Sequence, residues 1–156
     1  MKSYSSKDMK RCNHLLGEIE SVYHEMSLKF GLSDSTMIIL YTICDEGDAC
    51  LLKDICSRSG LSKQTINSAL RKLEAEGIVY LEAAGAKSKT VCLTKKGKGL
   101  AKATAIRVIE AENEILASWS REDVEKYLGL MEHFLMGLKE KAKEIEADEN
   151  SIIGSF

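Results

Sequence analysis

Apolar side chains recur at steps of three and four residues from Met9 to Phe30, and Gly31 interrupts the pattern. This is the period of one face of an α-helix, and a glycine commonly ends a helix. A second stripe has alternating steps of four and three residues, at Val124, Leu128, Met131, Leu135, Leu138, Ala142 and Ile145. Heptad spacing of this kind is typical of a helix that packs along a seam against another helix. Long amphipathic helices are therefore predicted near both ends of the chain.

Three shorter helical segments are predicted between these ends. The first spans residues 33–44 and begins with a serine that can cap it, and the polar residues 45–48 indicate a turn. The second spans 51–56 and is broken by a glycine-containing turn at 57–60. The third spans 62–76, begins with another capping serine and stops before a glycine.

Two short runs rich in β-forming residues follow, at 78–81 and 90–93. The segment 83–89 between them contains a glycine, so the two runs are predicted to form a hairpin with a small tip. Thr94 can cap a long helix that is predicted to continue through Leu116. The chain is therefore predicted to be mostly α, with a short helix, a turn, a second helix and a two-stranded β wing in its middle.

Charge is distributed unevenly along the 156 residues, although the net charge is only −2. Residues 53–102 hold eleven basic and four acidic side chains, a local charge of +7, which leaves −9 for the rest of the chain. A basic middle between acidic ends favours contact of the middle with phosphates.

The remaining composition indicates a cytoplasmic protein. No stretch reaches the roughly 18 apolar residues of a membrane span, and no apolar run follows the charged N-terminus as in a signal peptide. The five cysteines have no framework spacing, so they are expected to be reduced thiols.

The order of elements in residues 51–94 is that of a helix-turn-helix followed by a hairpin, with a steep crossing permitted by Gly60. Glutamine and asparagine can pair with an adenine edge, while lysine, arginine and hydroxyl groups can reach phosphates. An ordinary solvated helix face is the alternative for these polar positions. The predicted DNA-binding residues are Ser62, Lys63, Gln64, Thr65, Asn67, Ser68, Arg71, Lys72, Lys87 and Lys89.

Residues 61–78 (LSKQTINSALRKLEAEGI) resemble the recognition helix of MarR-type (multiple antibiotic resistance) regulators. Residues 91–97 are similar to the Val-x-Leu-Thr-x-x-Gly sequence that ends the wing in that family. The resemblance implies a winged helix-turn-helix, a homodimer that binds an inverted-repeat operator as a repressor, and release by a small, often phenolic, ligand or by cysteine oxidation.

The sequence departs from the family at the wing. Gly85-Ala86-Lys87 stands where the family usually has Asp-x-Arg. Lysine is a point charge without the planar fork of arginine. A looser wing that contacts phosphate more than the minor groove is therefore expected.

The resemblance also divides the chain into regions. Residues 1–31 and 95–147 are expected to form a helical dimerisation region, 32–94 a DNA-binding lobe, and 148–156 a flexible tail. The expected dimer interface contains Leu15, Ile19, Val124, Leu128, Met131, Leu135 and Leu138.

Other candidate sites have weaker support. Cys44, Cys50 and Cys56 are six residues apart, whereas zinc ligands favour separations of two to four, so no metal site is expected. Cys12 lies on the apolar stripe, which favours core packing over redox sensing. An effector pocket is a further hypothesis, with core packing as the favoured alternative for its residues Tyr23, Met37, Tyr41 and Trp119.

No nucleophile elbow, phosphate-binding glycine loop or dinucleotide fingerprint occurs in the sequence, so neither catalysis nor a cofactor is expected. The sequence favours a sequence-specific transcriptional repressor whose partners are double-stranded DNA, a second copy of itself and a small aromatic effector. Two alternatives stay open: a winged-helix protein-interaction module without DNA binding, and a thiol-based redox sensor.

Overall fold

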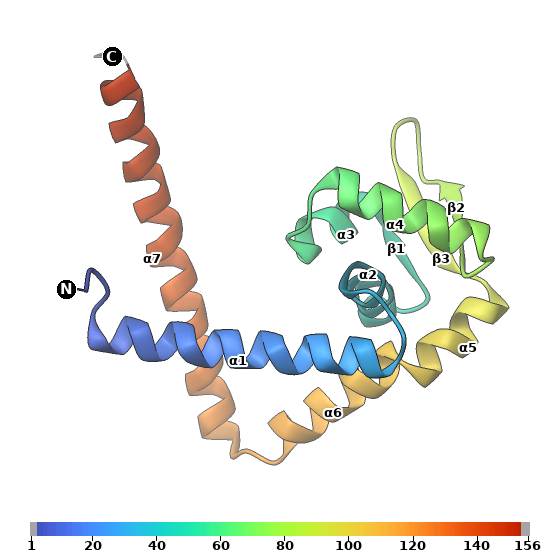
Figure 1. The fold of residues 1–156 in the computed structure, drawn as a ribbon, viewed down its shortest axis with the longest axis horizontal. Helices are drawn as coiled ribbons and strands as arrows, with labels where there is room; N and C mark the ends of the chain where they lie inside the picture. The colour runs from blue at the N-terminus through green and yellow to red at the C-terminus, as the bar shows by residue number, and fades with distance from the viewer. Residues whose placement is uncertain (1–2, 154–156) are drawn as a thin grey trace. The chain divides into compact units, whose positions relative to one another are not determined.

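The computed structural model describes residues 3–153 (Figure 1). Their elements are α1 (Lys7–Lys29), α2 (Asp34–Asp45), β1 (Ala49–Leu51), α3 (Leu52–Ser59), α4 (Lys63–Ala75), β2 (Val79–Ala83), β3 (Lys89–Leu93), α5 (Lys95–Ala103), α6 (Ala105–Ala117) and α7 (Arg121–Ile153). This mostly helical fold with a small sheet confirms the predicted class. The chain divides into two compact units, residues 1–110 and 111–156, which we describe separately.

Hydroxyl side chains begin several of the helices. The side chains of Ser33, Ser62 and Thr94 each accept a hydrogen bond from the backbone N–H three residues further on. Such a bond satisfies a helix N–H that has no partner within the helix. All three caps were predicted, because capping depends only on residues that are close together in the sequence.

The sheet of unit 1 has three antiparallel strands in the order β1-β3-β2. The predicted hairpin is confirmed as β2 and β3, paired from Val79↔Leu93 to Ala83↔Lys89. A third strand was not predicted: residues 49–51 pair with the other edge of β3. A three-residue strand directly before a helix has too few positions to show a period of two.

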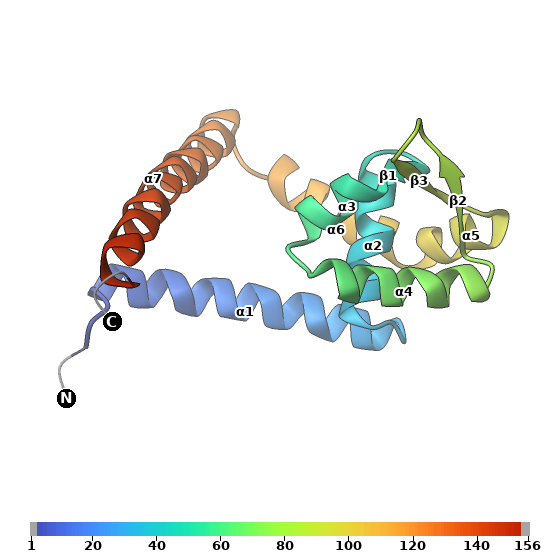
Figure 2. The same ribbon diagram turned by 90° about the horizontal axis from the view of Figure 1, so that it is seen from above.

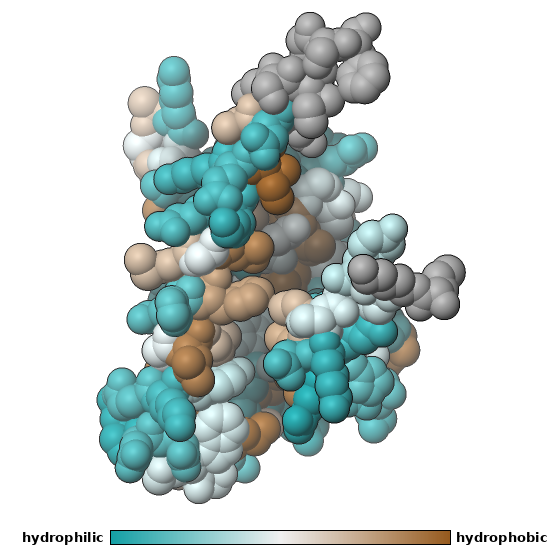
Figure 3. Space-filling model, turned by 90° about the vertical axis from the view of Figure 1, so that its left-hand side faces the viewer, coloured by the Kyte–Doolittle hydropathy of each residue, from teal (hydrophilic) through white to brown (hydrophobic). Residues whose placement is uncertain are grey.

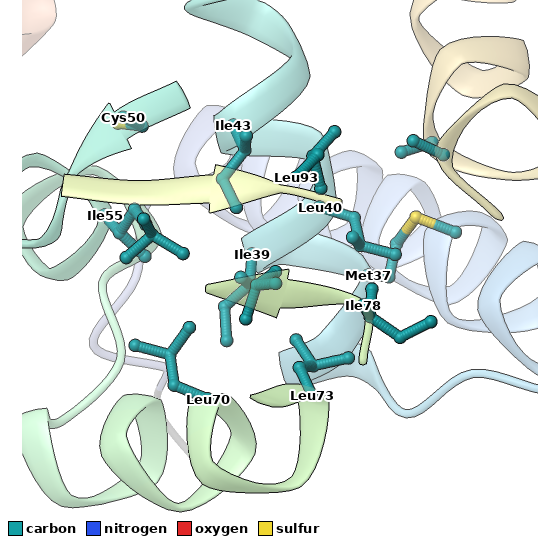
Figure 4. Close-up of a cluster of buried hydrophobic side chains, with 14 of the residues drawn as sticks. Met37, Ile39, Leu40, Ile43, Cys50, Ile55, Leu70, Leu73, Ile78 and Leu93 are labelled. Atoms are coloured by element: carbon teal, nitrogen blue, oxygen red, sulfur yellow. The ribbon is translucent and has the colours of Figure 1, made fainter. Parts of the chain in front are cut away.

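The core of unit 1 lies between α2, α3, α4 and the sheet. Ile39, Ile43 and Ile55 are completely buried in it. In Figure 4, Leu70 and Leu73 of α4 point toward Ile39 of α2. Apolar contacts therefore hold one face of α4 against the rest of the lobe and leave its opposite face toward solvent.

The start of α5 is fixed against the end of α4. The Thr94 hydroxyl donates to the Gly77 carbonyl at 2.6 Å, and the Thr94 N–H donates to the Ile78 carbonyl at 3.0 Å. A Cβ on Gly97 would lie 2.0 Å from the Ile78 oxygen. The threonine and glycine of the Val-x-Leu-Thr-x-x-Gly sequence therefore permit a close approach of two backbones.

The long helix predicted from Thr94 through Leu116 is interrupted, so that prediction is wrong at one point. α5 ends at Ala103 and α6 begins at Ala105. Thr104 lies between them with φ −132° and ψ −88°, outside the helical region. Periodicity could not reveal this break, because apolar positions continue through it.

Unit 2 consists mainly of α7, a helix of 33 residues. Ser120 caps it by accepting a hydrogen bond from the Asp123 N–H. The helix continues through residues 148–153 of the segment predicted to be a flexible tail, while residues 154–156 lie outside the described part of the chain. None of the helices within residues 3–153 is long and apolar enough to cross a membrane.

Large apolar side chains remain on the surface of α1 and α7. In the view of Figure 3, hydrophobic side chains reach the surface among hydrophilic ones. Cys12 is also exposed, so the expectation that it packs in a core is wrong for the single chain. The exposed members of the predicted dimer interface are Leu15, Ile19, Leu128, Met131, Leu135 and Leu138, and Val124 is half-buried.

Unit 1 includes α1 and α5, which the sequence assigns to a dimerisation region. That assignment and the boundaries at 31 and 95 stay predictions.

Candidate nucleic-acid interface

The turn between α3 and α4 is compact. Gly60 follows α3 with a φ of +67°, a left-handed conformation that glycine adopts without steric cost. The Leu61 N–H donates to the Ser59 hydroxyl at 3.2 Å, and Ser62 then caps α4. The chain therefore reverses within three residues and presents the N-terminus of α4 to solvent.

α4 separates apolar and polar side chains onto opposite faces. Ile66, Leu70 and Leu73 are its buried residues. In Figure 2, α4 lies along one side of unit 1, with α2 and α3 on its inner side. Every α4 residue predicted to bind DNA is exposed, together with the capping serine: Ser62, Lys63, Gln64, Thr65, Asn67, Ser68, Arg71 and Lys72.

A shallow concavity lies beside this polar face. Gln64, Ser68 and Lys72 line one side of it, and Ser35 and Thr36 of α2 line the other. Within it the Ser33 hydroxyl donates to the Thr36 hydroxyl at 2.9 Å. The sequence predicts Ser33 only as a helix cap and does not reveal the contribution of α2 to this surface.

The wing ends in a short closed loop. The Ala84 N–H donates to the Ser88 carbonyl at 2.9 Å, and the Ser88 hydroxyl donates back to the Ala84 carbonyl. Gly85 has a φ of +92° at the tip. Lys87 and Lys89 are both exposed here, so two cations stand at the end of the hairpin.

Two basic residues of the positive segment 53–102 form ion pairs with carboxylates outside that segment. Arg58 forms ion pairs with Asp45 and Glu46, and Lys98 pairs with Asp48 at 2.6 Å. The hydrogen bond that Lys98 donates to the Asp48 carboxylate raises the pKa of Lys98. These three carboxylates lie before residue 53, so the local charge of +7 overstates the positive charge of the folded lobe.

Two cysteines of unit 1, Cys44 and Cys50, are poorly suited to reaction. Burial, assisted by Asp48, raises the pKa of the Cys44 thiol from 9.0 to about 11, and burial also raises the pKa of Cys50. A thiol with a raised pKa is a weak nucleophile and a weak metal ligand at neutral pH. Within residues 3–153, no group of three or more potential ligands could hold a metal ion.

The predicted effector-pocket residues lie in different environments. Met37 is part of the lobe core, Tyr41 packs partly buried against that core, and Tyr23 is exposed. Trp119 belongs to unit 2, where its ring contacts Tyr127 edge-to-face with centroids 5.4 Å apart. None of these residues lines the concavity beside α4, and the effector pocket stays a prediction.

This part of the chain is similar in sequence to a known protein family. Residues 30–88 match the model of the MarR family. In sequence, this part of the lobe is similar to the MarR family. The resemblance seen in the recognition helix is thereby confirmed, and the match spans α2, β1, α3, α4, β2 and the wing tip.

Solved structures share the fold of nearly the whole chain. A MarR family regulator from Neisseria meningitidis has a TM-score of 0.77 at 17% identity, over 89% of this chain and 99% of that one. MepR from S. aureus, in a complex with DNA, has a TM-score of 0.62 at 20% identity, over 88% and 99%. NadR, in a complex with 4-hydroxyphenylacetate, has a TM-score of 0.66 at 15% identity, over 86% and 96%. A search of curated proteins finds no match.

Proposed function

We propose that this chain is a homodimeric transcriptional repressor that binds an inverted-repeat operator. The observation that carries the proposal is the division of α4, with Ile66, Leu70 and Leu73 anchored in the core and the polar face exposed. A rigid helix with a free polar face can enter a major groove, where amide side chains distinguish bases. The role is one of binding rather than catalysis.

In the proposed complex, different residues of α4 have different tasks. Gln64 and Asn67 lie in its first two turns and contact base edges, where a bidentate amide–adenine pair gives sequence preference. Arg71 and Lys72 follow one turn later and contact phosphates, which position the helix without specifying a sequence. Lys87 and Lys89 contact the backbone beside the groove from the wing.

The exposed apolar stripes of α1 and α7 support a dimer. Leu135 is half exposed and Met131 slightly more, although burying such a side chain stabilises a structure by about 1.5–3 kcal/mol. A second copy of the chain would cover these side chains. Two copies related by a two-fold axis would place two α4 helices on DNA, with half-sites about 10 bp apart.

We also propose that a small aromatic effector releases the protein from its operator. NadR was solved with 4-hydroxyphenylacetate, which shows that a protein of this fold can hold such a ligand. In this chain Tyr23, Met37 and Tyr41 of unit 1 are the proposed contacts. Effector binding would act by favouring a dimer geometry that no longer fits the operator.

Substitution of Arg71 tests the phosphate contact. Arg71→Ala should weaken binding to all duplex sequences and reduce the slope of log K against log salt by about 1, because one fewer counterion is released. Binding is measured by fluorescence anisotropy over a salt series. Lys139→Ala is the control, since Lys139 is exposed on α7 and should leave the slope unchanged. Equal slopes for wild type and Arg71→Ala would contradict the phosphate role.

The interaction-module alternative predicts a different result in the same series. A winged helix that binds only protein would show weak DNA binding even at low salt. The wild-type curve therefore separates the two functions before any variant is compared.

A further inference from the structure

The C-terminal end of α4 leaves backbone carbonyls without partners inside the helix. Gly77 has a φ of +70°, and its N–H donates to the Glu74 carbonyl at 2.9 Å. The Ile78 N–H donates to the Leu73 carbonyl, also at 2.9 Å. A helix that ends with this pair of bonds turns the chain away before the last carbonyls can accept. The carbonyls of Glu76 and Gly77 can therefore accept from groups outside α4.

The start of α5 supplies the donors. The Lys96 ammonium donates to the Glu76 carbonyl at 2.8 Å, and the Thr94 hydroxyl donates to the Gly77 carbonyl at 2.6 Å. The Thr94 N–H donates to the next carbonyl, that of Ile78, at 3.0 Å. The end of α4 and the start of α5 lie side by side in both ribbon views (Figures 1 and 2). Three consecutive carbonyls at the end of α4 are thus bound by Thr94 and Lys96, which we call the α4 anchor.

The location of Lys96 indicates that its charge serves α4 rather than α5. Lys96 lies in the first turn of α5, where the helix dipole disfavours a cation. Its ammonium lies instead at the C-terminal end of α4, where the dipole favours one. Lys95 lies in the same turn of α5, but within residues 3–153 its ammonium has no hydrogen bond or ion pair. The two adjacent lysines therefore differ in what their side chains contact.

The buried face of α4 fixes the position of the helix only coarsely. Ile66, Leu70 and Leu73 are buried in the core, but the hydrophobic effect has no direction. A hydrogen bond weakens steeply when its geometry changes, so bonds at the end of a helix resist sliding and rotation. The α4 anchor therefore adds directional bonds to one end of a helix whose first two turns carry Gln64 and Asn67.

We propose that Lys96 is a positioning residue that, together with Thr94, holds α4 in the orientation in which its side chains recognise bases. This inference rests on the proposed function. A base contact requires its side chain to lie within about 0.5 Å of the productive geometry, whereas attraction between a lysine and a phosphate extends over roughly 10 Å at ~0.1 M salt. Loss of the α4 anchor should therefore reduce the preference for the operator over random DNA and leave the salt dependence unchanged.

Two substitutions at adjacent positions test the role of Lys96. Lys96→Met and Lys95→Met each remove one positive charge from the first turn of α5 and keep an unbranched side chain. Only Lys96→Met removes the bond to the Glu76 carbonyl. Fluorescence anisotropy over a salt series measures the affinity of each variant for random duplexes and for a duplex selected from a random pool by the wild-type protein.

We expect Lys96→Met to lower the ratio of operator affinity to random-duplex affinity at least threefold, because α4 spends less time in the orientation that recognises bases. The slope of log K against log salt should stay at its wild-type value. Lys95→Met should leave the ratio unchanged. An equal ratio for Lys96→Met and Lys95→Met would overturn the proposal.

Other roles of Lys96 predict other results in the same series. If Lys96 contacts a phosphate, Lys96→Met should reduce the salt slope by about 1 and weaken operator and random duplexes equally. If Lys96 only stabilises the fold, partial unfolding should lower both affinities by one factor and keep their ratio. Either result would contradict a positioning role.

Thr94 gives a second test of the α4 anchor. Thr94→Ser keeps the hydroxyl and should keep the wild-type ratio. Thr94→Val cannot donate to the Gly77 carbonyl, so it should lower the ratio at least as much as Lys96→Met. A serine variant that loses the ratio as the valine variant does would contradict the role of the hydroxyl. Lys96 is exposed, so its variants keep the test available if Thr94→Val does not fold.

Amide hydrogen exchange distinguishes failure of this inference from failure of the proposed function, because it needs no DNA. In Lys96→Met, the Gly77 and Ile78 amides should exchange at least threefold faster than in Lys95→Met, while the Ile43 amide in α2 should exchange at an unchanged rate. Equal exchange at Gly77 and Ile78 in the two variants would overturn the α4 anchor whatever the DNA result. If the wild type prefers no duplex sequence, the proposed function fails, and the role of Lys96 in recognition fails with it.

Discussion

Gly97 is the residue at which the lobe tolerates no side chain. A Cβ there would lie 2.0 Å from the Ile78 carbonyl oxygen, which is a backbone atom that cannot rotate away. At Gly99, two residues further along α5, a Cβ would have no neighbour within 4 Å. The two glycines therefore form a matched pair in one helix.

Alanine substitutions of this pair should have opposite effects. Gly97→Ala should lower the free energy of unfolding by about 1–3 kcal/mol or more, because α5 must move away from residue 78. Gly99→Ala should raise it by up to about 1 kcal/mol through helix propensity. Urea unfolding followed by circular dichroism measures both. A Gly97→Ala variant as stable as the wild type would show that the close approach is not required.

The thiols should differ in reactivity according to their exposure. Cys12 is exposed, whereas burial raises the pKa of Cys44 to about 11. In a variant that breaks the dimer, iodoacetamide at pH 7.5 should therefore modify Cys12 well before Cys44 or Cys50, as measured by peptide mass spectrometry. Faster modification of Cys44 would contradict its raised pKa.

The same shift in pKa predicts how stability depends on pH. The folded state holds the Cys44 proton more tightly than the unfolded state, whose thiol ionises near 9.0. The contribution of the protonated Cys44 thiol to the free energy of unfolding is therefore present in full below pH 9 and is lost as the pH rises toward 11. Cys44→Ser should make the free energy of unfolding depend less steeply on pH in this range.

Among the elements, α7 carries the clearest test of assembly. Leu135→Asp places a charge in the centre of the apolar stripe and should break the dimer, because an unpaired charge in a seam is not solvated. Light scattering measures the mass in solution. His133→Asp is the control, since His133 is exposed and lies away from the heptad seam. A Leu135→Asp variant that stays dimeric would contradict the seam.

The elements also show what could be predicted from sequence. The caps Ser33, Ser62 and Thr94 and the hairpin β2–β3 follow from residues that are neighbours in the chain. β1 could not be predicted, because its three residues become a strand only by pairing with β3. The break at Thr104 could not be predicted either, since threonine is common inside helices and Thr42 makes the same hydroxyl–carbonyl bond within the unbroken helix α2.

The same distinction applies to the candidate interface. Exposure of Gln64 and Arg71 follows from the helical period of α4 and could be predicted. The proximity of Ser35 and Thr36 to α4 depends on the packing of α2, and the ion pairs of Lys98 and Arg58 join positions far apart in sequence. The polar face of α4 could therefore be predicted from the sequence, but the unpaired positive charge of the lobe was overestimated.

At the scale of the whole molecule, the proposed function requires three features of the chain to act together. The lobe presents α4 with an exposed polar face, and the wing places cations beside the groove. The apolar stripes of α1 and α7 are the surface on which a second copy of the chain binds. Any one of these features is compatible with a protein-interaction module. Their combination in one dimer predicts recognition of a repeated DNA sequence.

Selection of duplexes from a random pool by the purified wild-type protein, followed by sequencing, tests this claim most directly. We expect enrichment of an inverted repeat with half-sites about 10 bp apart, bound by a dimer with an affinity that falls steeply with salt. A retained pool with no enriched sequence, together with weak binding at low salt, would overturn the proposed function and favour a winged helix that binds protein.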